Sequence, residues 1–97
     1  MTTLETIRFR LEPGITDADF LRRNFRVENE YMARRPGFVS RTTSRSDDGE
    51  WLVMVQWASV QDAEATIGAF FGAPQTQEFL AAVDKSTVAS GRYQIVD

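Results

Sequence analysis

The side chains of this sequence that could take part in chemistry are amides, arginines and aromatic rings. The 97 residues include no cysteine and no histidine, so the chain has no thiol nucleophile and lacks the commonest general base and metal ligand. Its serines and aspartates have no partner spaced as a nucleophile and its base, and its glycines do not form a phosphate-binding loop. The sequence therefore predicts no metal and no cofactor, and it singles out no catalytic residue.

Seven side chains are candidates for binding a small ligand, because each falls where a predicted helix or strand could border a cavity. They are Asn24, Tyr31, Gln56, Trp57, Phe70, Phe71 and Arg92. Each also has a structural interpretation. A buried amide needs a hydrogen-bond partner, so Asn24 either orients a ligand or touches water at the edge of its helix stripe. Tyr31 reaches a pocket rim or lies at the core margin, and Trp57 is core or cavity wall.

Four arginines on predicted strands could bind an anion or a phenolate if their strand faces coincide. They are Arg8, Arg10, Arg41 and Arg92. Such arginines more often pair with neighbouring acids. Glu5, Glu50 or the acids of a partner subunit could fill that role here. The sequence leaves both interpretations open.

A Gly72-Ala73-Pro74 break separates two predicted helical segments and has two interpretations. Phe70, Phe71 and Phe79 flank this break. They could form ordinary core packing under a kink, or they could belong to a mobile lid over a cavity mouth.

The predicted elements follow the order β-α-β-β-α-(α)-β. Residues 4–11 alternate apolar and polar side chains, as a strand does. One helix is predicted over residues 17–34 behind a capping box at residues 16–19, and a second follows the cap at residues 59–62. A short third helix begins after Pro74 and carries Phe79, Leu80 and Val83, and a last strand spans residues 87–96.

Residues 35–57 are typical of a β-hairpin, in which Pro36-Gly37 ends the preceding helix and Asp48-Gly49 supplies the turn. The number of loop residues decides which side chains share a face. We favour an even number, since it gathers the largest apolar group and both tryptophans on one face. That arrangement places Phe38, Ser40 and Thr42 with Val53, Val55 and Trp57, and it places Val39, Arg41 and Thr43 with Leu52, Met54 and Gln56. An odd number swaps these partnerships.

This element order predicts an α+β fold of the ferredoxin-like type. Two β-α-β halves form a four-stranded antiparallel sheet with both long helices on one face. The other face is then bare, and it carries Arg8, Arg10 and part of the hairpin. Because a half-apolar bare face favours association, we expect a homodimer in which sheet faces sheet.

The composition predicts one domain over residues 1–97, since 42% hydrophobic residues support one modest core. A net charge of −3, with the basic residues scattered among acids, gives no footprint for nucleic acid. No apolar run reaches membrane-spanning length, and the first residues do not read as a secretion signal. We therefore expect a cytoplasmic protein with neither a nucleic-acid nor a membrane partner.

Several short motifs lie between Tyr31 and Trp57: Pro36-Gly37-Phe38, the DDGEW turn, and a VQW run before a serine-capped helix. With them, the chain resembles the dimeric α/β-barrel proteins of the antibiotic biosynthesis monooxygenase type. The order and length of the elements extend this resemblance over nearly the whole chain. It implies a homodimer whose two sheets form a barrel, with a small-molecule cavity between helices and sheet in each subunit.

The same resemblance implies a range of activities, from cofactor-free oxygenases acting on polycyclic phenols to haem-degrading enzymes and cyclases. The haem-degrading branch calls for an asparagine on the first strand, a tryptophan in the helix after the third strand, and a later histidine. Here the first strand offers Ile7, Arg8 and Phe9, the helix offers Ala65 and Thr66, and there is no histidine. That branch is disfavoured.

Two functions therefore remain open. The first is a cofactor-independent monooxygenase acting on an aromatic or polyketide-like substrate held between helices and sheet. The second is a dimeric ligand-binding or accessory protein without turnover. A helix–sheet space filled solid by Phe9, Phe20, Trp57 and Phe70 would weaken both.

Overall fold

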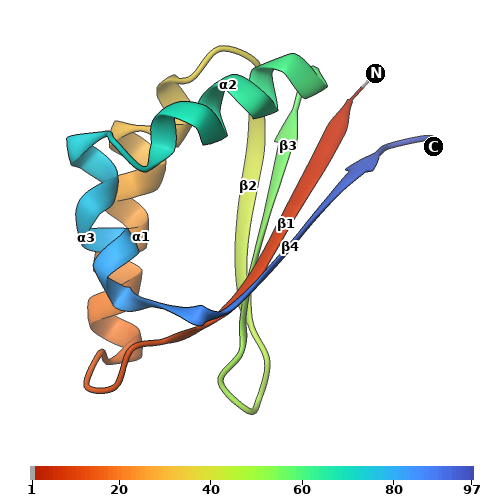
Figure 1. The fold of residues 1–97 in the computed structure, drawn as a ribbon. Coiled ribbons are helices and arrows are strands. Elements are labelled where there is room, and N and C mark those ends of the chain that lie inside the picture. Colours follow the sequence, from red (N-terminus) through yellow and green to blue (C-terminus); the bar gives the residue numbers. More distant parts are fainter. Residues whose placement is uncertain (1) are drawn as a thin grey trace.

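A four-stranded antiparallel sheet carries the helices on one of its faces (Figure 1). The computed structural model describes residues 2–97, and its strands lie in the order β2-β3-β1-β4. The predicted α+β, ferredoxin-like fold is confirmed. The elements are β1 (Thr3–Leu11), α1 (Asp17–Glu30), η1 (Met32–Arg34), β2 (Phe38–Arg45), β3 (Trp51–Trp57), α2 (Val60–Phe70), η2 (Pro74–Thr76), α3 (Gln77–Ala82) and β4 (Val83–Gln94).

Both long helices begin at the predicted caps. The Thr16 hydroxyl accepts a hydrogen bond from the Asp19 amide at 3.1 Å, and the Ser59 hydroxyl accepts one from the Asp62 amide at 3.2 Å. The first helix is shorter than predicted, because α1 ends at Glu30 and the chain continues as the tighter turn η1. The last strand is longer than predicted, since β4 begins at residue 83 rather than 87.

The apolar stripe of α1 is narrower than the sequence pattern indicates. Phe20, Asn24 and Val27 are the buried residues of this helix. Phe25 is 70% exposed, and Leu21 is also exposed. Each of these two residues follows a buried residue by one position, which turns its side chain about 100° around the helix and away from the sheet.

The hairpin has an odd loop, so the predicted even loop is wrong. Arg45 pairs with Trp51, which leaves the five residues 46–50 in the loop. The loop is closed by a hydrogen bond of 2.8 Å from the Ser46 amide to the Glu50 carbonyl, and Gly49 takes a φ of +93°. Arg41 therefore lies opposite Val55 and shares its face.

A β-bulge at Val39 shifts the pairing of β2 with β3 by one residue near the start of β2. Phe38 pairs with Trp57, but Ser40 pairs with the next residue, Gln56. The extra residue, Val39, is exposed, and Phe38 lies back on the helix side with its ring 5.9 Å from the Trp57 ring. Phe38 thus shares a face with Trp57 as predicted, although the loop prediction behind it was wrong.

The core lies between the sheet and the helices, and aromatic rings dominate one end of it. The Phe20 ring centroid lies 4.6 Å from that of Trp51 and 5.6 Å from those of Phe9 and Phe79. Edge and tilted arrangements of this kind are favourable beyond their buried area. This cluster joins β1, β3, α1 and α3 at the end of the sheet where β4 begins.

The second face of the sheet carries none of the described helices (Figure 1). Cross-strand pairs show which side chains share that face. They include Leu4, Thr6, Arg8, Leu52, Met54, Gln56 and Tyr93. No helix within residues 2–97 is both long enough and apolar enough to span a membrane.

Candidate functional site

A cavity of about 390 Å³ lies between the helices and the sheet. This volume falls within the range of small-molecule pockets. Its lining is mostly apolar: Ile7, Phe9, Met32, Val53, Val55, Ile67, Phe70, Phe71, Phe79, Leu80, Val83 and Val88. Four polar or charged residues complete it, namely Glu5, Arg41, Lys85 and Ser90. The helix–sheet space is therefore not filled solid.

All four strands contribute to this cavity. Arg41 comes from β2, Val55 from β3, Glu5 from β1 and Ser90 from β4. Three strand spacings separate β2 from β4, which places the two ends of the cavity on the order of 14 Å apart along the sheet. The polar residues thus lie toward opposite ends, with an apolar stretch between them.

Glu5 is buried and each of its carboxylate oxygens accepts a hydrogen bond. Trp57 donates its indole Nε1–H to Oε1 at 3.0 Å. Arg92 donates from Nη2 to Oε2 at 2.9 Å, and it also lies 3.8 Å from a carboxylate oxygen of Glu64. These donors hold a carboxylate in an otherwise unfavourable buried position.

A second hollow, of about 270 Å³, adjoins the first beside β4. Glu5, Ile7, Ile67 and Ser90 border both hollows, and Arg92 borders only the second. The two spaces therefore meet at Glu5, so the charged Glu5–Arg92 pair lies where they join.

Arg41 reaches the cavity from β2. Its side chain is only 3% exposed, and Nη1 donates to Oε1 of Glu28 at 3.2 Å. Burial lowers the pKa of the Arg41 guanidinium, and the hydrogen bond and charge of Glu28 raise it in part. The guanidinium carbon also lies 5.8 Å from the centre of the Phe79 ring, within reach of a cation–π contact.

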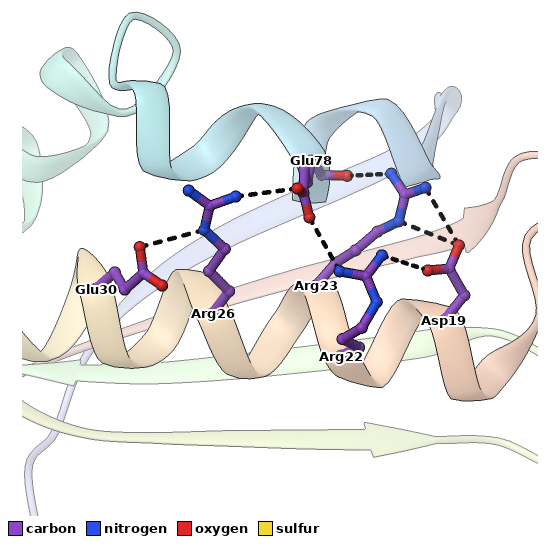
Figure 2. Close-up of polar contacts among 6 residues, drawn as sticks. All are labelled: Asp19, Arg22, Arg23, Arg26, Glu30 and Glu78. Atoms are coloured by element: carbon purple, nitrogen blue, oxygen red, sulfur yellow. Dashed lines mark hydrogen bonds and ion pairs between the residues drawn. The ribbon is translucent and has the colours of Figure 1, made fainter.

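Helix α3 covers one side of the cavity with Phe79 and Leu80, and ion pairs fasten it to α1 (Figure 2). The Glu78 carboxylate accepts hydrogen bonds from Arg22 at 3.3 Å and from Arg26 at 3.0 Å. Arg23 donates to the Glu78 backbone carbonyl at 2.7 Å. This short helix thus has three polar contacts with α1 on its outer side.

Asp19 organises the arginines at one end of this contact (Figure 2). Its carboxylate accepts hydrogen bonds from Arg23 at 3.2 Å and from Arg22 at 2.8 Å. Both bonds lower the pKa of the Asp19 carboxyl from its usual value, and the bond from Arg23 has the larger effect. Asp19 therefore stays ionised at neutral pH and keeps both arginines directed toward α3.

The break between α2 and α3 is fixed by side-chain hydrogen bonds. The buried Thr76 hydroxyl shares its single O–H between the backbone carbonyls of Phe70 and Ala73, whose oxygens lie 2.5 and 2.9 Å from Oγ1. Gln77 donates its amide to the carbonyls of Phe71 and Ala73, at 3.0 and 2.9 Å. These contacts support the core-packing interpretation of the break.

Three of the seven predicted ligand-binding residues border a hollow. Phe70 and Phe71 line the main cavity. Phe71 is 65% exposed and lies where α2 ends. Arg92 borders the adjoining hollow. Ligand binding by these three residues remains a prediction.

The other four predicted residues do not line the main cavity. Asn24 is buried against β2, where its Nδ2 donates to the Thr43 hydroxyl at 3.1 Å. The Tyr31 hydroxyl donates to the Thr66 carbonyl at 3.0 Å. Trp57 is fully buried. Gln56 pairs with Leu4 on the opposite face of the sheet.

The four arginines considered together do not form one cluster. Arg8 and Arg10 pair with acids of the hairpin loop, Arg41 pairs with α1, and Arg92 pairs with Glu5. Each cation is thus neutralised locally, as the alternative interpretation predicted. Among residues 2–97, no group of three or more histidine, cysteine, aspartate or glutamate side chains is placed to hold a metal ion.

Sequence reasoning did not select Glu5 or Lys85 as cavity residues, and it named Arg41 only as a possible member of an anion-binding cluster with Arg8, Arg10 and Arg92. The signal for Glu5 was present, because position 5 shares the strand face of Ile7 and Phe9. The signal for Arg41 depended on the length of the hairpin loop. Lys85 falls in the part of β4 that was predicted to lie outside a strand.

Solved structures similar to this chain include an oxygenase, a monooxygenase and a protein described as an antibiotic biosynthesis monooxygenase. SnoaB, a cofactor-independent oxygenase from Streptomyces nogalater, matches with a TM-score of 0.79 at 19% identity, over 99% of this chain and 94% of its own. A protein of Bordetella bronchiseptica, provisionally described as an antibiotic biosynthesis monooxygenase, matches with a TM-score of 0.81 at 15% identity, over 98% and 97% of the two chains.

A third solved structure contains a ligand. The monooxygenase ActVA-Orf6 of Streptomyces coelicolor, in complex with nanaomycin D, matches with a TM-score of 0.74 at 19% identity, over 98% of this chain and 88% of its own. No family model and no curated protein sequence matches the chain. The resemblance expected from the sequence is thus confirmed at the level of the fold.

Proposed function

We propose that this chain binds a small, largely apolar aromatic molecule in the cavity between its helices and its sheet. The observation that carries this proposal is the cavity itself: about 390 Å³ of space with an apolar lining and a few charged groups. Pockets of this composition bind small ligands by apolar contact and orient them with a small number of polar groups. The aromatic rings of Phe70, Phe71 and Phe79 suit a flat ring system.

Binding can be tested with a cavity-blocking variant. Ile67 lines both hollows, so Ile67→Trp places an indole where the ligand would lie. Val39→Trp adds the same ring at an exposed position outside the cavity. Isothermal titration with a panel of fused-ring phenols should give binding to the wild type and to Val39→Trp, and at least tenfold weaker binding to Ile67→Trp. Equal affinity in all three proteins would refute a ligand site in this cavity.

A second candidate function is cofactor-independent oxygenation of that ligand. It is favoured by the shared fold with SnoaB, a cofactor-independent oxygenase, and with ActVA-Orf6, which is solved with nanaomycin D. In such a reaction a phenol reacts with O₂ to give a quinone and water, so the substrate itself supplies the electrons. The reaction requires a group that takes the phenolic proton. Glu5 is the carboxylate of the cavity lining, and we assign it as the candidate proton acceptor.

Oxygen consumption separates the two functions. Wild-type protein is mixed with each phenol that it binds, without flavin, metal or reductant, and uptake of one O₂ per quinone formed is measured. Glu5→Gln should lower the rate by about 100-fold or more, as the loss of a general base does, while Glu64→Gln, on the far side of Arg92, should keep it. Tight binding without oxygen uptake would favour the alternative, a ligand-binding or accessory protein.

We further propose that two copies of the chain associate through the sheet face opposite the cavity. Leu52 and Met54 give this face an apolar strip along β3, and Tyr93 lies across Gly91 and Thr6 beside it. Leu52 and Met54 are half-buried and Tyr93 is exposed, and apolar surface of this kind favours association. Met54→Asp should shift the sedimenting species from dimer to monomer, whereas Val39→Asp should not. A monomeric wild type at micromolar concentration would overturn this arrangement.

A further inference from the structure

Arg41 is a buried cation that uses only part of its hydrogen-bonding capacity. A guanidinium group carries five N–H donors in a planar fork. One of these, on Nη1, is taken up by Glu28. The Nε atom is buried and has no hydrogen-bond partner among residues 2–97. Although buried donors are nearly always paired in folded proteins, Arg41 keeps hydrogen-bonding capacity that no described residue uses.

The counter-ion of Arg41 lies on one side of it only. Glu28 approaches from α1 and remains 38% exposed. The cavity around Arg41 is bordered by the apolar side chains of Met32, Val55 and Phe79. Little water can reach a side chain that is 3% exposed, and charge interactions are stronger in such surroundings than in solvent.

The other charged groups of the lining each have a hydrogen-bond partner among residues 2–97. Both carboxylate oxygens of Glu5 accept hydrogen bonds from Trp57 and Arg92. The Lys85 ammonium donates to the Leu80 carbonyl at 3.3 Å, and the Lys85 side chain is exposed. Arg41 is therefore the cation of this lining that combines burial with an unused donor.

We propose that Arg41 binds an anionic oxygen of the cavity ligand, so that the ligand is a flat aromatic molecule carrying a carboxylate or a phenolate at one end. The inference rests on the proposed binding function and names its ligand class. The anionic end lies against β2, where Arg41 enters the cavity. The aromatic body extends across Val53 and Ile7 toward β4.

The test compares two probes of the same shape. 2-Naphthoate carries a carboxylate, and 2-naphthamide replaces it by a neutral amide. Hydrogen bonds to charged groups are stronger than those between neutral groups, by amounts that correspond to roughly 10- to 100-fold in affinity. Wild-type protein should therefore bind 2-naphthoate at least tenfold more tightly than 2-naphthamide. 2-Naphthol, titrated at rising pH, separates the two kinds of anion, because a phenolate site binds it more tightly as it ionises.

Arg41→Met removes the guanidinium and keeps most of the side-chain volume. This variant should lose the preference for 2-naphthoate and retain the affinity for 2-naphthamide, which also shows that the cavity is intact. Arg45→Met is the matched control: it removes an arginine from the same strand that is exposed and paired with Asp17. That control should keep the wild-type preference.

Glu28→Gln distinguishes ligand binding from a merely structural ion pair. Loss of the Glu28 charge leaves Arg41 without its counter-ion, so affinity for 2-naphthoate should rise several-fold while affinity for 2-naphthamide stays unchanged. A purely structural pair predicts no difference between the two probes. Failure of the wild type to bind any of these aromatic probes would overturn the proposed function together with this inference. Equal binding of the charged and neutral probes would overturn the inference alone.

Discussion

Gly37 has the least space for a Cβ atom among the glycines of the described residues, and Gly37→Ala should be strongly destabilising. This residue has a φ of +79°, and a Cβ atom added to it would lie 2.1 Å from Oδ2 and 2.6 Å from Cβ of Asp62. The left-handed conformation costs an alanine about 1–2 kcal/mol. Displacing the Asp62 side chain adds overpacking of about 1–3 kcal/mol. The total expected loss is therefore about 2–5 kcal/mol.

Gly14→Ala is the matched control. Gly14 has a φ of +89°, yet a Cβ atom there meets no other heavy atom of the described residues within 4 Å. Its expected cost is the backbone strain alone, about 1–2 kcal/mol. Urea unfolding at 25 °C and one protein concentration, followed by circular dichroism, gives both free energies if the m-values agree.

A double-mutant cycle isolates the contact. Asp62→Gly removes the three atoms nearest to the new methyl group, which are Oδ2, Cγ and Cβ of Asp62, so Gly37→Ala in that background should cost no more than Gly14→Ala. The coupling between the two sites should be about 1–3 kcal/mol. Equal costs of Gly37→Ala and Gly14→Ala in the otherwise wild-type protein would show that Asp62 moves aside freely, and the steric argument would then be refuted.

Of three further predictions, one concerns the charged contact between α1 and α3, and two concern residues of the core. Folding lowers the pKa of the Asp19 carboxyl from its ordinary value of 3.8. The ionised carboxylate therefore stabilises the folded state above pH 3.8, and this stabilisation is lost as the pH falls through the lower pKa of the folded protein. In urea titrations, the free energy of unfolding of the wild type should drop more steeply between about pH 5 and pH 2 than that of Asp19→Asn. Phe79→Ala should lower the free energy of unfolding by about 3 kcal/mol, the low end of such changes because this ring already borders open space; a loss under 1 kcal/mol would contradict its core role. Trp57→Phe should cost about 2–4 kcal/mol, since it removes buried volume and the indole donor to one oxygen of Glu5. A smaller cost of the same change in a Glu5→Leu background would show that the oxygen left without a donor is responsible, while an equal cost would assign the loss to volume alone.

The features predicted correctly from the sequence are those that short stretches of chain determine. The caps at Thr16 and Ser59 depend on a hydroxyl and an amide three residues apart. The sheet and its helices then follow from the element order, because few compact arrangements of β-α-β-β-α-β exist. The end of helical structure near Arg34, where η1 ends, and the turn at Asp48-Gly49 were likewise found from glycine and proline positions.

The candidate site was predicted less well, because the face on which Arg41 lies depends on the number of residues in the hairpin loop. Whether the hairpin loop contains four or five residues decides whether Arg41 faces the helices or the open side. Hydrogen bonds of the Ser46 side chain to the Glu50 amide and to Asp48 stabilise the five-residue form, and no periodicity reports them. A buried arginine is also the exception among arginines. Asn24 and Tyr31 fit the helix stripe, but β2 and α2 cover them before they reach the cavity.

The cavity crosses all four strands, and this has a consequence for the lifetime of the protein. An apolar space bordered by β1 to β4 is a part of the core that the chain does not fill itself. A bound molecule would supply that missing part and stabilise the folded state by about 2.7 kcal/mol at a concentration of 100 times its dissociation constant. Amide hydrogen exchange would then slow throughout the sheet rather than near one contact. In a cell, the supply of ligand would set how often the chain unfolds, and so how long it survives proteolysis.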